Sequence, residues 1–122
     1  MVDLRRRRRK HHAVLPPGPP LYGECTPAMA NGAIARLRPH PARSVREPLR
    51  AAGYGEKPAT YVISERDAIL PANVAERVAA LAQATAISLD SDHHPMLSRP
   101  AELALILAGI VARTALAEPA TS

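Results

Sequence analysis

Two β-prone runs separated by a helical segment lie between residues 59 and 89, and this pattern limits the possible folds more than any other part of the chain. The first run, ATYVIS from Ala59, is β-branched and aromatic and has the length of a strand. The second is Thr85–Leu89. A strand, a crossover helix and a second strand form the unit from which parallel sheets are built. The sequence therefore predicts an α/β fold.

The segment that begins at Pro71 predicts an amphipathic helix over the sheet. Glu76 and Arg77 fall on its polar side. We expect the other side to face the strands, with apolar residues recurring at helical spacing: Val74, Val78 and Leu81, with Ala75 and Ala82 beside them.

Helices are also predicted on both sides of this unit. Upstream, Thr26 can cap a helix with Pro27 at its first position, followed from Pro39 to Pro58 by a connecting loop with one turn of helix. Downstream, Ser98 can cap a long helix. The apolar stripe of that helix consists of Leu103, Ile106, Leu107, Ile110 and Val111.

The first 20 residues are predicted to be a tail, separate from a body at residues 21–122. Arg5–Lys10 contribute six of the 16 Lys and Arg residues, and without residues 1–10 the chain has ten basic and ten acidic residues. A block of like charge followed by PPGPP does not form a packed element. The tail could bind phosphates in a salt-dependent way, but no aromatic residues interleave it, so no specific nucleic acid is expected.

Cysteine use and hydropathy predict a cytoplasmic protein without a membrane partner. Cys25 is the single cysteine and excludes an intramolecular disulfide. HHAVLPPGPP follows the basic start where a signal peptide would have an apolar run. The most apolar stretch, Ala101–Leu116, is interrupted by Arg113 and is shorter than the roughly 20 residues that span a bilayer.

A carboxylate follows the first predicted strand and an imidazole follows the second. Asp67 and His93 should meet, because the carboxyl ends of neighbouring parallel strands lie at one edge of a sheet. An Asp bonded to a His ring fixes its tautomer and stabilises the imidazolium, as in a catalytic triad. On spacing alone, the more common roles are a turn residue for Asp67 and, for His93, an exposed residue or a hydrogen-bond donor that braces the loop.

TYVISERDAILP and DSDHHPMLSRPAELA resemble the acid and histidine segments of α/β-hydrolases in the small-esterase and hydroxynitrile-lyase group, and LYGECTPAMANGAIARLRPHP resembles the end of their lid. The resemblance covers about residues 21–115, the last third of that fold. It implies a carboxylic-ester hydrolase with Asp67 as triad acid and His93 as base. His94 stands where the family usually has a serine.

The nucleophile of that family lies in a Gly-x-Ser-x-Gly elbow, which this chain does not contain, and the oxyanion-hole segment is missing as well. We therefore expect no substantial esterase activity from the chain alone, and self-association through an uncovered sheet edge. A small ester would be the substrate of a complete enzyme. The alternative function is a noncatalytic basic adaptor that binds an anionic partner through its arginine tail.

The chain offers two further candidate chemistries, a cysteine nucleophile and a metal site. Cys25 could replace the nucleophile with His93 as its base, although it precedes a proline-started helix rather than a tight elbow. A metal site is not predicted, because neighbouring side chains in an extended loop point apart, and no cofactor is expected. The neighbouring residues that could be considered as metal ligands are Asp90, Asp92, His93 and His94.

Overall fold

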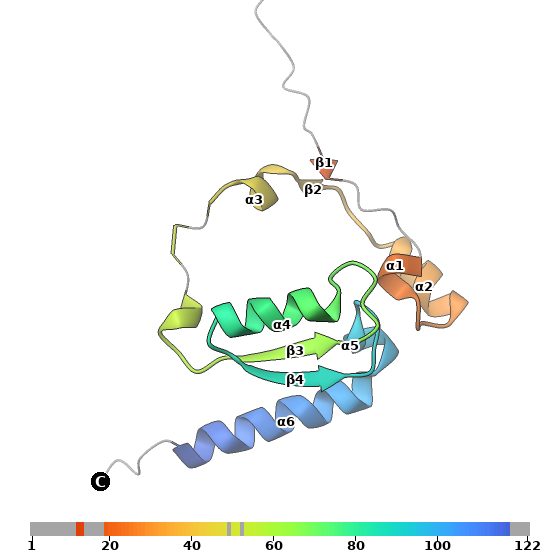
Figure 1. The fold of residues 1–122 in the computed structure, drawn as a ribbon. Helices are drawn as coiled ribbons and strands as arrows, with labels where there is room; N and C mark the ends of the chain where they lie inside the picture. Colours follow the sequence, from red (N-terminus) through yellow and green to blue (C-terminus); the bar gives the residue numbers. More distant parts are fainter. Residues whose placement is uncertain (1–11, 14–18, 49, 52, 118–122) are drawn as a thin grey trace, which may run out of the picture.

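The chain folds around a two-stranded parallel sheet with helices on both of its faces (Figure 1). The computed structural model describes residues 12–13, 19–48, 50–51 and 53–117. In chain order the elements are β1 (His12–Ala13), α1 (Pro19–Tyr22), α2 (Pro27–Ile34), β2 (His40–Pro41), α3 (Arg43–Arg46), the 3-10 helix η1 (Gly53–Gly55), β3 (Thr60–Ser64), α4 (Ala72–Leu81), β4 (Thr85–Leu89), α5 (Pro95–Ser98) and α6 (Pro100–Ala117).

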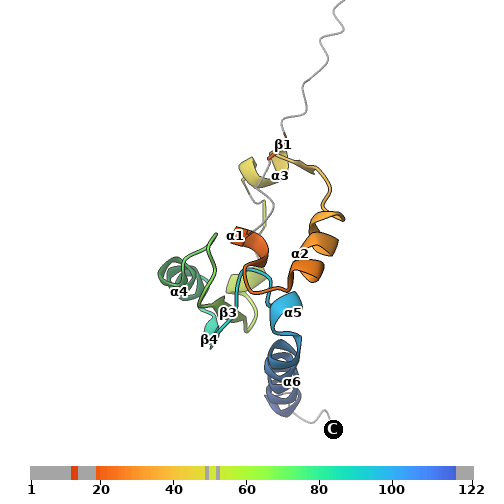
Figure 2. The same ribbon diagram turned by 90° about the vertical axis from the view of Figure 1, so that its right-hand side faces the viewer.

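The predicted strand, helix and strand unit is present. β3 and β4 pair in parallel, from Thr60 opposite Thr85 to Ser64 opposite Leu89, and α4 connects them. α4 and α6 lie on opposite sides of this sheet in both views (Figures 1 and 2). In the part of the chain that the structure describes, no third strand pairs with the outer edge of β3 or of β4. The expected self-association of the chain through such an open edge stays a prediction.

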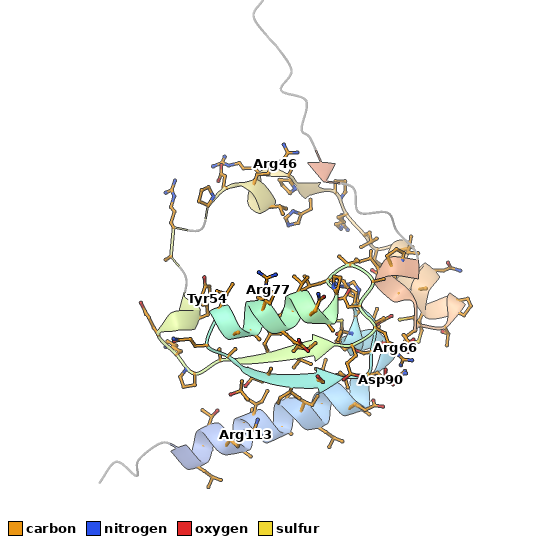
Figure 3. The ribbon with its side chains drawn as sticks, in the orientation of Figure 1. Arg46, Tyr54, Arg66, Arg77, Asp90 and Arg113 are labelled. Carbon is orange, nitrogen blue, oxygen red and sulfur yellow. The ribbon has the colours of Figure 1, made fainter. Side chains whose placement is uncertain are left out.

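The face of α4 that meets the sheet is only partly the predicted one, since it includes the predicted Ala75 but is centred on Ala75 and Ala79 rather than on the valines. Ala75 and Ala79 are buried, whereas Val74 and Val78 are about two-fifths exposed and Leu81 is 83% exposed. Two strand axes are only about 4.8 Å apart, and a helix with its side chains is about 10 Å wide. The alanines let α4 approach this narrow sheet, and the larger side chains stay partly or largely exposed. The predicted polar side is correct, since Arg77 points away from the strands (Figure 3).

The two predicted helix caps have different outcomes. The Thr26 hydroxyl accepts a hydrogen bond from the N–H of Met29 at 3.3 Å, with Pro27 at the first helical position of α2, so this cap is confirmed. Ser98 is instead the last residue of the short helix α5, and α6 starts at Pro100. Arg99 has φ −138° and ψ 53°, because the residue before a proline is disfavoured in helical conformation.

The predicted loop between residues 39 and 58 contains the single turn α3 and the 3-10 helix η1. In Figure 1 it arches over α4 on its way to β3. Of the predicted tail, residues 1–11 and 14–18 lie outside the described residues. His12–Ala13 pair antiparallel with His40–Pro41, and α1 begins at Pro19.

Helices α1 and α2 lie at the carboxyl ends of β3 and β4, close to α5 (Figures 1 and 2). Leu21 and Tyr22 of α1 are buried there, at 5% and 6% exposure. The segment around α1 therefore lies next to the loops that carry Asp67 and His93.

Candidate functional site

Asp67 and His93 meet at the carboxyl edge of the sheet. The Nδ1 atom of His93 lies 2.8 Å from Oδ2 of Asp67. The Asp67 side chain is 9% exposed and the His93 side chain 31%. The structure thus brings together the two residues that the sequence selected, with the carboxylate inside and the imidazole open to solvent.

The backbone after β3 holds the Asp67 carboxylate in place. Its Oδ1 atom accepts hydrogen bonds from the N–H groups of Ile69 at 2.8 Å and Leu70 at 2.9 Å. Burial raises the pKa of Asp67, but the hydrogen bonds from Leu70, His93 and Ile69 outweigh it and hold that pKa below the ordinary value. Asp67 is therefore ionised at neutral pH.

The ionised carboxylate decides which nitrogen of His93 carries the proton. A carboxylate can only accept, so Nδ1 must donate, and the other ring nitrogen, Nε2, keeps its lone pair in the neutral ring. In a triad this is the nitrogen that takes a proton from the nucleophile.

Asp92, one residue before His93, ties this edge of the sheet to the segment after α1. It is 3% exposed, and its carboxylate accepts the N–H groups of Glu24 at 3.0 Å and His94 at 3.1 Å and the Ser98 hydroxyl at 2.7 Å. Burial raises the pKa of Asp92, but these hydrogen bonds outweigh that effect, so the net pKa lies below the ordinary value. Asp92 is thus a charged structural anchor, a role that the sequence did not reveal.

His94 lies between His93 and α1 and contacts both. Its Nδ1 atom donates to the Leu21 carbonyl at 2.9 Å, and its ring centroid lies 4.8 Å from that of Tyr22. The rings of His93 and His94 meet edge to face with centroids 4.9 Å apart. His94 therefore packs the segment around α1 against the candidate base.

A charged rim, made of Glu24, Arg66, Asp90 and Arg99, surrounds the same edge. Nη2 of Arg66 lies 2.7 Å from Oε2 of Glu24, and Nη2 of Arg99 lies 3.0 Å from the same oxygen. Arg66 also pairs with Asp90, its Nε 2.7 Å from Oδ1, and the two side chains lie together in Figure 3. The rim links residue 24 to the loops after both strands.

Polar contacts continue past the ends of the strands. Glu65 donates its N–H to the Leu89 carbonyl at 3.0 Å, and Arg66 donates to the Ser91 carbonyl at 2.9 Å. Ser91 is fully buried, with its hydroxyl 3.1 Å from that of Ser64. These bonds hold the two loops at a fixed separation and so position Asp67 against His93.

The structure argues against Cys25 as a nucleophile. Its Sγ atom lies 4.0 Å from Oδ2 of Asp92. Burial raises the pKa of the Cys25 thiol, and the carboxylates of Asp92 and Glu24 raise it further. A protonated thiol is a poor nucleophile. Among the described residues, no hydroxyl or thiol is hydrogen-bonded to Nε2 of His93.

The four crowded acidic and histidine residues point to different partners. Asp90 pairs with Arg66, Asp92 with Glu24 and Ser98, His93 with Asp67, and His94 with Leu21. Within the described ranges, no group of three or more side chains is arranged to hold a metal ion.

In the described part of the chain, no helix has the length and apolar character to cross a bilayer. The basic run Arg5–Lys10 lies outside the described residues, so its binding to an anionic partner stays a prediction. Comparisons with protein-family models, curated proteins and solved structures found no match.

Proposed function

We propose that this chain carries the acid and the base of an α/β-hydrolase of the carboxylic-ester hydrolase type, with Asp67 as the acid and His93 as the base. The observation that supports it is the 2.8 Å contact between Nδ1 of His93 and Oδ2 of Asp67, where two adjacent parallel strands end. A partly exposed imidazole with an available Nε2, held by a nearly buried carboxylate, is the arrangement that general-base catalysis needs.

In the proposed reaction, Nε2 of His93 takes the proton of an attacking hydroxyl and later returns a proton to the leaving alcohol. The Asp67 carboxylate stabilises the imidazolium that forms between these steps. The segment around α1, held by His94 and Asp92, would form part of the substrate enclosure. No metal or cofactor takes part.

The proposal includes low activity for the 122-residue chain by itself. A base without a nucleophile and an oxyanion hole lacks the groups that contribute most to acyl transfer. We expect the chain to hydrolyse a short-chain nitrophenyl ester at the same rate as a His93→Ala variant. His40→Ala, which changes an exposed histidine on β2, is the matched control. An activity lost in His93→Ala but kept in His40→Ala would show that the chain is an active esterase.

The role of the base is tested separately by the reactivity of its ring nitrogen. Diethyl pyrocarbonate acylates the unprotonated nitrogen of an imidazole, and peptide mass spectrometry reports the rate at each histidine. We expect His93 to react, and to react several-fold more slowly in Asp67→Asn because the proton moves to Nε2. An unreactive His93, or a rate that Asp67→Asn leaves unchanged, would contradict the assignment of His93 as base.

A further inference from the structure

We propose that α6 is the contact surface of a homodimer, in which it packs antiparallel against α6 of a second copy around a two-fold axis. The helix is apolar on almost every side: Glu102 and Arg113 are its only charged residues. Such a helix normally lies inside a larger structure. Yet none of residues 100–116 is buried, and its largest exposed side chains are Leu105 at 75%, Leu107 at 51%, Val111 at 68% and Leu116 at 87%.

The apolar residues of α6 divide into two faces. At 3.6 residues per turn, the half-buried residues Leu103, Ile106 and Ile110 lie on one side. The other side carries an outer stripe of exposed residues: Ala101, Leu105, Ala108, Ala112 and Ala115. Their alternating spacing of four and three residues is that of a helix–helix seam. The alanines allow two helix axes to approach closely, while Leu105 and Leu116 supply the larger apolar contacts.

Charge complementarity indicates that the partner covering the outer stripe of α6 is a second copy of the chain. Glu102 and Arg113 are both exposed, lie on the same side of the outer stripe and are equally distant from the midpoint between Leu107 and Ala108. An antiparallel two-fold pair centred there places Glu102 of each copy beside Arg113 of the other. A parallel pair would leave Glu102 of one copy and Arg113 of the other about 16 Å apart along the helix axes, too far to form an ion pair. Within the described residues, neither side chain forms an ion pair inside its own chain.

The first test is the mass of the full chain in solution, measured by light scattering over a range of concentrations. We expect twice the chain mass of 13.0 kDa. A mass of one chain, or an open series of larger species, would overturn the proposal, because a two-fold contact closes after two copies.

Charge reversal then tests the arrangement. We expect Glu102→Lys and Arg113→Glu each to weaken dimerisation about tenfold, since each change creates two repulsive pairs per dimer. The double variant should restore the affinity of the original chain. A double variant as weak as the single ones would overturn the antiparallel arrangement. Far-ultraviolet circular dichroism of each variant shows whether its helices are retained.

Cross-linking locates the axis. In a Cys25→Ala background, Ala108→Cys places a thiol next to the proposed axis, and mild oxidation should give a disulfide-linked dimer. Ala80→Cys, another exposed alanine on a helix, is the matched control and should stay monomeric under denaturing conditions. Equal cross-linking at both positions, or none at position 108, would contradict the proposed contact.

Discussion

The carboxylate of Asp92 accepts a hydrogen bond from the backbone N–H of Glu24 at 3.0 Å, across 68 positions of sequence. The same carboxylate accepts from the His94 N–H and the Ser98 hydroxyl. Asp92→Ala would leave the two backbone N–H groups without their acceptor, whereas the Ser98 hydroxyl keeps a contact of 3.3 Å with the His94 carbonyl. Each buried unsatisfied donor costs about 1–3 kcal/mol. Because such costs do not add fully, we expect the free energy of unfolding in urea to fall by about 3 kcal/mol.

Asp90→Ala is the control for that experiment. The Asp90 side chain is 66% exposed and pairs with Arg66 at the surface. Exposed ion pairs contribute about 0–1 kcal/mol, so we expect a loss within that range. Equal losses for Asp90→Ala and Asp92→Ala would show that Asp92 is not a buried anchor.

The stability of the chain should depend on the ionisation of Asp67 and Asp92. Despite burial, hydrogen bonds hold the pKa of each carboxyl below its ordinary value in the folded chain. The stability that each contributes is therefore present above its unfolded pKa and is lost as the pH falls through the lower, folded pKa. We expect the free energy of unfolding to decline below about pH 4, measured by denaturation at a series of pH values. The Asp67→Asn, Asp92→Asn double variant should show a shallower decline, and an unchanged slope would contradict this origin.

The strands and the pair at their ends could be predicted because the signals are local. The run Thr85–Leu89 is β-prone and is followed by Asp90, and it forms β4 with those bounds. Once two strands are parallel and adjacent, the residues that follow them lie at the same edge of the sheet, which is why the contact between Asp67 and His93 could be predicted. Asp92 was missed as an anchor because its partner, Glu24, lies far away in the sequence and no local pattern marks the pairing.

The exposure of the larger apolar side chains of α4 could not be predicted for a different reason. Periodicity identifies side chains that favour burial, such as Val74 and Val78, but not the width of the surface available to cover them. In a sheet of two described strands, Ala75 and Ala79 occupy that surface. Ser98 shows a related limit. A serine before a helical run matches a cap, and only the fold reveals that its hydroxyl donates to Asp92.

The tautomer of His93 should depend on Asp67. In the original chain the carboxylate accepts from Nδ1, so the neutral ring is expected to carry its proton there. An asparagine at position 67 can present its amide N–H to Nδ1 instead, which moves the ring proton to Nε2. We expect nitrogen-15 NMR of the imidazole rings to show this change in Asp67→Asn.

His94 is an internal control in the same spectra. Its Nδ1 atom donates to the Leu21 carbonyl, a group that Asp67→Asn does not alter. We expect its proton to stay on Nδ1. If His93 kept its tautomer in Asp67→Asn, or if both rings changed together, Asp67 would not be the group that orients His93.

Gln83, just after α4, has a left-handed backbone with φ 53°. The N–H of Ala84 donates to the Ala79 carbonyl at 2.9 Å and that of Gln83 to the Ala80 carbonyl at 3.1 Å, the helix-ending motif in which glycine is the usual residue. A Cβ atom costs about 1–2 kcal/mol in this conformation, and glycine removes that cost. Part of the resulting gain in stability is lost, because glycine makes the unfolded chain more flexible. We therefore expect Gln83→Gly to raise the free energy of unfolding by about 0.5–1 kcal/mol in urea denaturation. Gln83→Ala keeps the Cβ and should show no such gain, so stabilisation by both variants would point to the glutamine side chain rather than to the backbone.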